Sequence, residues 1–197
     1  MSSSHKEEHM EDAYLTKLKS QNDDEISAAL YTILHEPNKS KYFNEIIKHL
    51  NKGDLNVRLP ATMILAKISN KNTIPYLEKM LNDNNKKIQI EAALGLAKYK
   101  NKKCYSVLKE VIEKDYHDHS IHKRSIEALG KFKDNNLLPI FKIGIYHRRK
   151  ASRIKSIDAL AKINSKESIV LLKEALGKEK EPEIKCRIKN ILALKKF

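Results

Sequence analysis

The sequence of 197 residues contains no tryptophan, only two cysteines, and five residues each of glycine and proline. So few glycines and prolines exclude a collagen-like or loop-dominated chain. Cys104 and Cys186 are too few for a disulfide framework and form no CxxC motif. The aromatic content of 6% argues against a surface that stacks nucleic-acid bases. The length leaves one compact domain, two small ones or an elongated array.

Long apolar runs are also missing from the sequence. No stretch approaches the about 20 apolar residues that cross a bilayer, and the first 20 residues hold no signal-peptide core. We therefore expect a soluble intracellular protein, located in the cytoplasm, with reduced thiols. Residues 1–11 are polar and are predicted to form a flexible tail ahead of a single domain over residues 12–197.

Lysine is what the chain has in excess. It carries 39 Lys and Arg against 25 Asp and Glu, a formal net charge of +14, and only six of the basic residues are arginine. Residues 1–50 hold 6 basic and 9 acidic groups, whereas residues 51–197 hold 33 and 16. A general compositional bias does not by itself confine positive charge to one part of a chain. The distribution predicts an anionic partner.

A segment of 12 residues recurs along the chain at spacings of 31, 33 and 31 residues. The four copies are VRLPATMILAKI (57–68), IQIEAALGLAKY (88–99), IHKRSIEALGKF (121–132) and SRIKSIDALAKI (152–163). A fifth copy covers residues 184–195, and a weak one covers 26–37. Each copy has apolar residues at helical spacing, so each predicts a helix with one buried face. We call this recurring element helix B.

A second recurring segment precedes each of these and predicts a partner helix, which we call helix A. It reads TIPYLEKML (73–81), CYSVLKEVI (104–112), LLPIFKIGI (137–145) and SIVLLKEAL (168–176), with YFNEIIKHL (42–50) as an earlier relative. Pro75 and Pro139 share one position near the start of helix A, where a missing N–H costs nothing. A single hairpin cannot bury its apolar face alone, but stacked hairpins can. The fold is therefore predicted to be all-α, with five clear repeats after a degenerate first one.

The repeated pattern, an Ile-Pro-containing helix A followed by a helix B with Val or Ile, Arg, small residues and Leu, resembles short HEAT-like repeats, including those of phycobilisome lyases. The resemblance covers roughly residues 40–197 and implies a superhelical solenoid of helical hairpins. Similar repeats serve scaffolds, adaptors, nucleic-acid binders and a few enzymes. Deoxyhypusine hydroxylases, which are similar in repeat type, need several His-Glu pairs, and only His35-Glu36 occurs here. Related DNA glycosylases rely on tryptophan, which this chain lacks.

Three groups of residues are candidates for partner binding. The first is one lysine position near the end of helix B, which repeats along an edge of the array. The second is a basic turn before a helix B, and the third is a set of apolar residues on the presumed inner face of helices B. In that order they are Lys67, Lys98, Lys131 and Lys162; Arg148, Arg149 and Lys150; and Leu59, Met63, Ile90 and Leu94.

Each group also has a structural interpretation. A lysine in the last turn of a helix complements the helix dipole, and a charged turn is often simply solvated. Arg58 and Arg153 occupy one repeat position, and an acid in the preceding turn, such as Asp54, is expected to pair with Arg58. For the apolar inner-face residues, the alternative is that the acidic N-terminal region folds over them.

The sequence contains none of the common nucleotide-binding, zinc-protease or nucleophile-elbow motifs. The histidine-rich stretch from His117 to His122 has metal-like spacing, but a polar turn between helices A and B explains it as well. We therefore expect no cofactor, no metal and no catalysis. The predicted function is that of an intracellular scaffold or adaptor that binds an acidic protein. Sequence-independent binding to nucleic-acid phosphates is the alternative, and a lyase-type enzyme subunit is the third.

Overall fold

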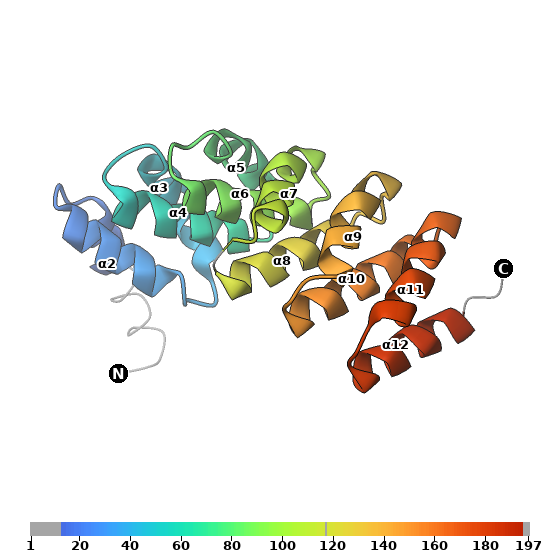
Figure 1. The fold of residues 1–197 in the computed structure, drawn as a ribbon. Coiled ribbons are helices and arrows are strands. Elements are labelled where there is room, and N and C mark those ends of the chain that lie inside the picture. Colours follow the sequence, from blue (N-terminus) through green and yellow to red (C-terminus); the bar gives the residue numbers. More distant parts are fainter. Residues whose placement is uncertain (1–12, 117, 195–197) are drawn as a thin grey trace, which may run out of the picture. The chain divides into compact units, whose positions relative to one another are not determined.

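The computed structural model describes residues 13–116 and 118–194, and these contain helices and no strands (Figure 1). The predicted tail, residues 1–11, lies outside the described residues. No helix in the described ranges is both long and apolar enough to span a bilayer. The chain divides into two compact units, residues 1–99 and 100–197, and each is described by itself. The single domain expected over residues 12–197 stays a prediction.

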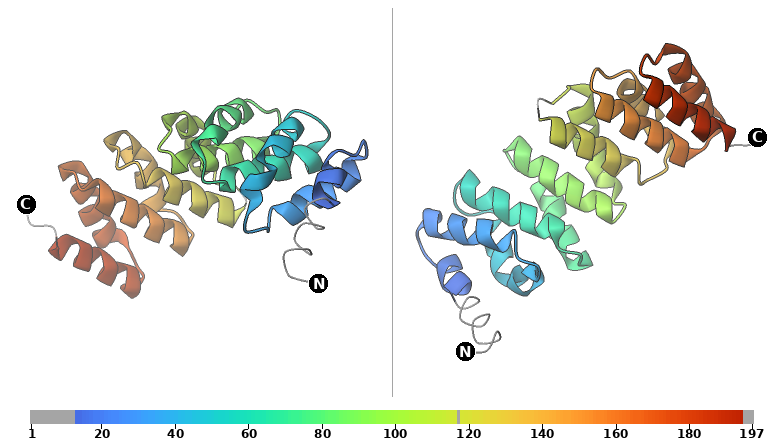
Figure 2. Two further views of the ribbon diagram at one scale, coloured as in Figure 1. Left: turned by 180° about the vertical axis from the view of Figure 1, so that it is seen from behind. Right: turned by 90° about the horizontal axis from the view of Figure 1, so that it is seen from below.

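The N-terminal unit is built from stacked helical hairpins. Its B-type helices are α2 (Asp23–Ile33), α4 (Leu55–Lys67) and α6 (Lys86–Lys98). The elements between them are η1 (Lys39–Tyr42), α3 (Phe43–Ile46), η2 (Ile47–His49), η3 (Lys71–Thr73) and α5 (Ile74–Met80). Helix α4 packs against both α2 and α6, and α5 packs against α6. The B-type helices thus form one layer and the A-type elements the other (Figure 2).

The C-terminal unit repeats this plan. Its A-type elements are η4 (Lys102–Cys104) with α7 (Tyr105–Glu113), η5 (Asn135–Leu137) with α9 (Leu138–Ile145), and α11 (Lys166–Lys178). Its B-type helices are α8 (His119–Leu129), α10 (Lys150–Ile163) and α12 (Pro182–Ala193). Helix α10 packs against α8, α9 and α11, so it is the centre of this unit.

The core consists of the apolar repeat positions that the sequence pattern identified. Leu65, Leu96, Leu129 and Leu160 share one position in helix B, and none has any exposed surface. Small residues allow neighbouring helices to approach closely. A Cβ atom at Gly95 in α6 would lie 2.9 Å from the Cα of Ala66 in the neighbouring helix α4, closer than real contacts allow. The predicted repeat phase is therefore confirmed.

Side chains cap the A-type helices and bind some of their first N–H groups. Asn70, Asn101 and Asp134 each accept a hydrogen bond from the backbone N–H two residues on, at 2.9–3.0 Å. Ser165 accepts from the N–H of Ser168 in a capping box. Because these donors are already used, the helix starts along this edge are less open to anions than bare helix ends would be.

Pro60 lies inside α4 and has no N–H for the carbonyl of Asn56 one turn earlier. The hydroxyl of Ser27, which lies in the preceding B-type helix, donates to this carbonyl at 3.0 Å. A neighbouring helix therefore supplies the hydrogen bond that the proline removes.

Candidate functional site

The four lysines of the predicted edge divide by unit. In the N-terminal unit Lys67 is exposed, while the ammonium of Lys98 donates to the carbonyl of Ala66 near the end of α4. Lys98 thus acts as a helix cap between repeats, which is the structural interpretation of this position. In the C-terminal unit Lys131 and Lys162 are exposed, and neither has an ion pair within the described residues.

The backbone just beyond three B-type helices takes the left-handed conformation. Lys100, Lys133 and Asn164 have φ angles of 54°, 53° and 55°, at equivalent positions after α6, α8 and α10. Glycine or asparagine usually fills this position because a larger side chain is strained there. Two of the three positions instead carry lysine, which adds positive charge to the edge.

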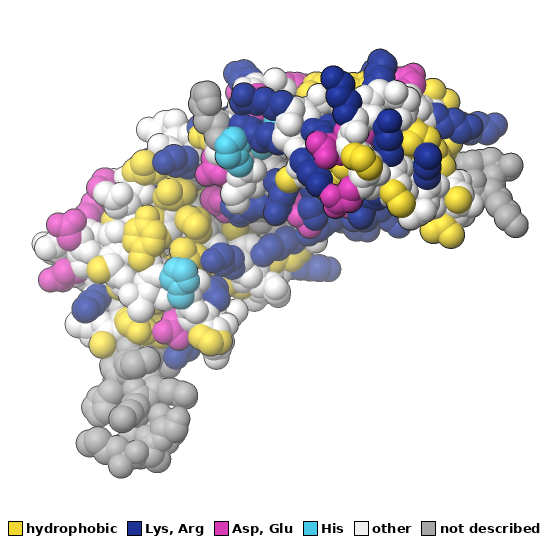
Figure 3. Space-filling model, turned by 60° about the horizontal axis from the view of Figure 1, so that its bottom comes forward, with side chains coloured by type: hydrophobic (Ala, Val, Ile, Leu, Met, Phe, Trp, Pro, Cys, Tyr) yellow, Lys and Arg dark blue, Asp and Glu magenta, His cyan; other side chains and the backbone are white. Residues whose placement is uncertain are grey.

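The net positive charge belongs almost entirely to the C-terminal unit. Residues 100–197 hold 25 Lys and Arg against 12 Asp and Glu, whereas residues 1–99 hold 14 against 13. The face in Figure 3 shows Lys and Arg side chains gathered over the C-terminal unit. A surface of this kind attracts anionic partners and speeds their encounter.

The arginines contribute little free charge because five of the six form ion pairs inside their own unit. Arg58 reaches Asp83 at 3.3 Å, and Arg153 reaches Glu179 at 2.8 Å. Both acids lie in the turn of the following repeat. The expected pairing of Arg58 with the preceding Asp54 is therefore wrong, because Asp54 caps α4 by accepting from the N–H groups of Asn56 and Val57.

The inner-face charges of the C-terminal unit also pair with one another. Lys155 on α10 lies 3.4 Å from Glu127 on α8, and Arg187 on α12 lies 2.6 Å from Asp158 on α10. The two pairs occupy equivalent repeat positions, so they form a ladder across the three B-type helices. Within this ladder the charges therefore cancel in pairs.

The predicted apolar patch on the inner face is smaller than expected. Ile90 has no exposed surface, so its assignment to an exposed patch is wrong. Leu59, Met63 and Leu94 are half-buried. The helical spacing correctly places these residues on α4 and α6, but spacing alone does not reveal how much of each side chain its neighbours cover.

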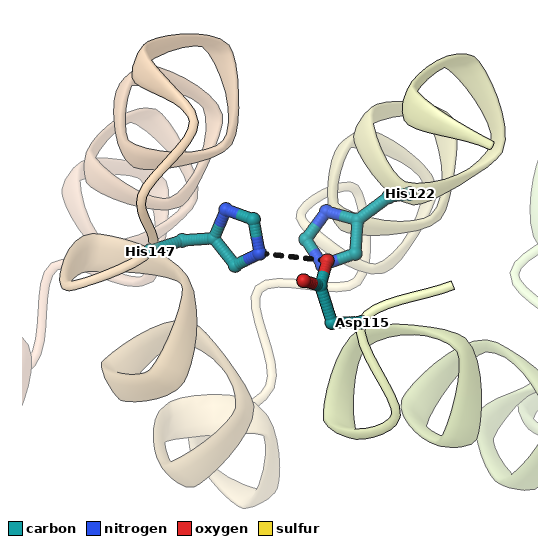
Figure 4. A group of neighbouring side chains, drawn as sticks. All are labelled: Asp115, His122 and His147. Carbon is teal, nitrogen blue, oxygen red and sulfur yellow. Dashed lines mark hydrogen bonds and ion pairs between the residues drawn. The ribbon is translucent and has the colours of Figure 1, made fainter. Parts of the chain in front are cut away.

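The basic turn before α10 is tied to Asp115, which lies just after α7. Figure 4 shows this carboxylate beside His147, the residue just before the two arginines. The carboxylate accepts from Arg149 at 2.6 Å, from Arg148 at 3.0 Å and from the Nε2 of His147 at 3.0 Å. Some desolvation opposes the shift, but these three donors hold the pKa of Asp115 below its usual range. Lys150, the third residue of this predicted group, pairs with Glu183. Arg148 remains 71% exposed, whereas Arg149 is largely buried.

His122 joins this cluster from α8. Its Nδ1 lies 3.0 Å from the hydroxyl of Ser152, its ring lies 4.5 Å from that of His147, and its buried Nε2 has no hydrogen-bond partner within the described residues. Burial, together with the nearby His147 and Arg149, lowers the pKa of His122 to about 4. His122 is therefore neutral at physiological pH.

By residue type Asp115, His122 and His147 resemble a metal site, and their ligand atoms lie within 4.8 Å of one another. The hydrogen bonds favour another interpretation. The N–H of Arg149 donates to the Nδ1 of His147 at 3.1 Å, so the proton of this ring is on Nε2, which donates to Asp115. No lone pair of His147 then faces the cluster, and two guanidinium groups already neutralise the carboxylate. As these side chains lie, they suit an internal polar network. His117, the first histidine of the predicted stretch, lies outside the described residues.

A family model of HEAT repeats matches residues 43–119 and 74–147, which together span more than half of the chain. The chain belongs to the HEAT-repeat proteins. No curated protein sequence matches it. The HEAT-repeat pattern and the all-helical hairpins agree, so the predicted family and fold class are both confirmed.

Solved structures similar to this HEAT-repeat protein include designed and natural repeat proteins. An engineered protein is 18% identical with a TM-score of 0.64, and the match covers 91% of this chain and 94% of that one. A designed armadillo-repeat protein is 16% identical with a TM-score of 0.62, covering 91% and 97%. A chain of the complex of CpcE and CpcF of phycocyanin lyase from Nostoc sp. PCC7120 is 15% identical with a TM-score of 0.55, covering 93% of each. At these identities the likeness shows the solenoid fold alone.

Sequence reasoning missed Asp115 and His147 as partners of the predicted arginines and of His122. A signal was present in the spacing. The pairs Arg58–Asp83, His122–His147 and Arg153–Glu179 are separated by 25 or 26 residues, so one inter-repeat contact recurs with different chemistry.

Proposed function

We propose that this HEAT-repeat protein is a non-catalytic scaffold that binds an acidic protein partner through the lysine edge of its C-terminal unit. By the lysine edge we mean Lys131, Lys133, Lys162 and Lys166, which lie around the ends of the B-type helices α8 and α10. The observation that carries the proposal is the division of charge within this unit. Four of its five arginines and the Lys155–Glu127 pair of the inner face form ion pairs inside the unit, whereas these four lysines form none within the described residues.

The proposal includes a location inside the cell and the absence of catalysis. Both cysteines are free, one buried and one exposed, as suits a reducing compartment. The most perturbed buried groups, such as Cys104, owe their pKa shifts to burial in the core, which gives no reason to assign them a catalytic role.

Nucleic-acid phosphate is the second candidate partner. An edge of lysines suits phosphates because an ammonium group contacts the phosphate backbone without reading the bases. Arginines, which read bases, are mostly held in ion pairs here already. The protein partner is preferred since the edge borders an apolar groove on α10 and α12, and apolar floors suit protein side chains better than phosphates.

Fluorescence anisotropy with two labelled probes tests the proposal. The probes are an acidic peptide of about 20 residues and a DNA duplex of matched charge. Each is titrated with the full chain at about 50 mM and about 200 mM salt. At the higher salt concentration we expect the peptide to bind more tightly than the DNA does. Binding to phosphates would instead lose affinity steeply as the salt concentration rises. Tighter DNA binding at both salt concentrations would favour the second candidate, and no binding of either probe would overturn both.

A further inference from the structure

A groove of about 760 Å³ lies between α10 and α12 of the C-terminal unit. Ligand-binding clefts commonly have volumes of this order. It is lined by Asp158, Ala161, Lys162, Glu183, Cys186, Arg187, Asn190, Ile191 and Leu194. The contact between α10 and α12 is much less extensive than that between α8 and α10. Helix α12 therefore packs less closely on α10 and leaves the groove open.

The groove has an apolar floor that neighbouring repeats do not expose. Ala161, Ile191 and Leu194 form this floor, and Leu194 is 86% exposed. Ile191 is half-buried, whereas Ala128 and Ala159, at the same repeat position, are buried. Exposed apolar surface in a cleft is costly in water and marks a place where another apolar surface docks.

The charges around the groove are balanced except at one place. Asp158 pairs with Arg187, and Glu183 pairs with Lys150. Lys162, which also lines the groove, has no ion pair within the described residues. An occupant therefore needs apolar side chains for the floor and a carboxylate for Lys162. A basic or purely apolar segment would leave this ammonium unpaired.

We propose that this groove is the docking site for one amphipathic segment of the acidic partner, with its apolar face on Ile191 and Leu194 and a carboxylate on Lys162. This inference rests on the proposed function. It specifies which kind of segment of the acidic partner enters the groove. It uses the helix-in-groove mode, in which apolar anchors give affinity and flanking charges give orientation.

Cys186 provides a direct reporter of occupancy. It lines the groove and is exposed, whereas Cys104 is buried and its pKa is raised to about 12 by that burial. A thiol reagent will therefore react with Cys186 alone in the folded protein. An occupant of the groove must slow that reaction.

The probe is a helical peptide of about 18 residues with leucines on one face and glutamates on the other. Two control peptides carry lysine in place of glutamate, or serine in place of leucine. We expect only the Leu–Glu peptide, at saturation, to slow the reaction of Cys186 by about tenfold or more. Equal protection by the lysine peptide would contradict the acidic assignment. A thiol that is already protected in the free protein would show that the groove is not open.

Two glutamate substitutions test the floor without disturbing the core, because both sites are exposed. Leu194→Glu removes apolar contact and adds repulsion, and it should weaken peptide binding about tenfold or more. Val170→Glu on α11 is the matched control, since Val170 is 55% exposed outside the groove. Equal effects of the two changes would overturn the proposal. So would a concentration-dependent dimer that Leu194→Glu dissociates, because a second copy would then be the occupant.

The two proposals can fail separately. Peptide binding that depends on Lys131 but leaves Cys186 unprotected would reject the groove and retain the acidic partner. Failure of every acidic probe to bind would reject both.

Discussion

The rings of His122 and His147 lie 4.5 Å apart at the repeat contact where Arg153 and Glu179 form a salt bridge one repeat later. At this contact between neighbouring repeats, two imidazole rings thus replace a pair of permanently charged side chains. Because burial holds the pKa of His122 near 4, well below its ordinary 6.5, the unfolded chain binds a proton that the folded protein does not. Stability should therefore fall as the pH drops below the unfolded value toward 4.

His122→Gln tests this pH dependence, since Gln89 fills the same repeat position in the N-terminal unit. Urea unfolding at neutral pH and at about pH 4.5 should show that the native protein loses about 2 kcal/mol more than the variant. Equal losses would mean that His122 does not control the acid response.

The salt bridge between Arg153 and Glu179 should contribute far more than the exposed pair of Lys150 and Glu183. The Glu179 side chain is only 6% exposed, so Arg153→Met leaves a buried carboxylate without its partner. We expect a loss of about 3 kcal/mol in unfolding free energy. Lys150→Met, at the 47% exposed lysine of the other pair, should change the unfolding free energy far less, because water already screens that pair. Similar costs for both would contradict the ranking.

The repeat phase predicts the effect of shortening a core leucine. Leu129 has no exposed surface, and Leu129→Ala should reduce the unfolding free energy by about 2–5 kcal/mol through lost burial and a cavity. Leu194→Ala is the control at an exposed leucine and should change it by less than about 0.5 kcal/mol. A small cost at Leu129 would mean that its packing is misassigned.

Ser27 and Pro60 should be coupled through the carbonyl of Asn56. Ser27→Ala removes the hydroxyl that donates to this carbonyl and should cost about 1 kcal/mol. Pro60→Ala restores the helical N–H, so the same serine change should then cost less. A double-mutant cycle measures the difference, and additive effects would show that the hydroxyl does not replace the missing bond.

The repeats could be predicted because periodic burial leaves a periodic sequence. Leu96, Leu129 and Leu160 recur in phase, and each is buried as that phase requires. Pro75 and Pro139 mark the first turns of α5 and α9 because only there is a missing N–H harmless. These features depend on local chemistry and on contacts that are the same in every repeat.

The candidate site was less predictable because it depends on contacts that differ between repeats. Arg58 was matched to the acid nearest in sequence, but its guanidinium reaches forward to Asp83 in the next turn. Ile90 has the spacing of an inner-face residue, yet its neighbours cover it completely. The less extensive contact of α12 with α10, which opens the groove beside Leu194, has no signature in the repeat pattern.

The central claim is that the lysine edge, rather than net charge alone, binds an acidic partner. Anisotropy of the labelled acidic peptide measures it most directly, with Lys131→Glu/Lys162→Glu compared against Lys142→Glu/Lys173→Glu. The control pair lies exposed on α9 and α11 and changes the total charge equally. The account predicts that the edge variant loses several-fold more affinity than the control while both keep the native helical signal. Equal losses in the two variants would contradict it.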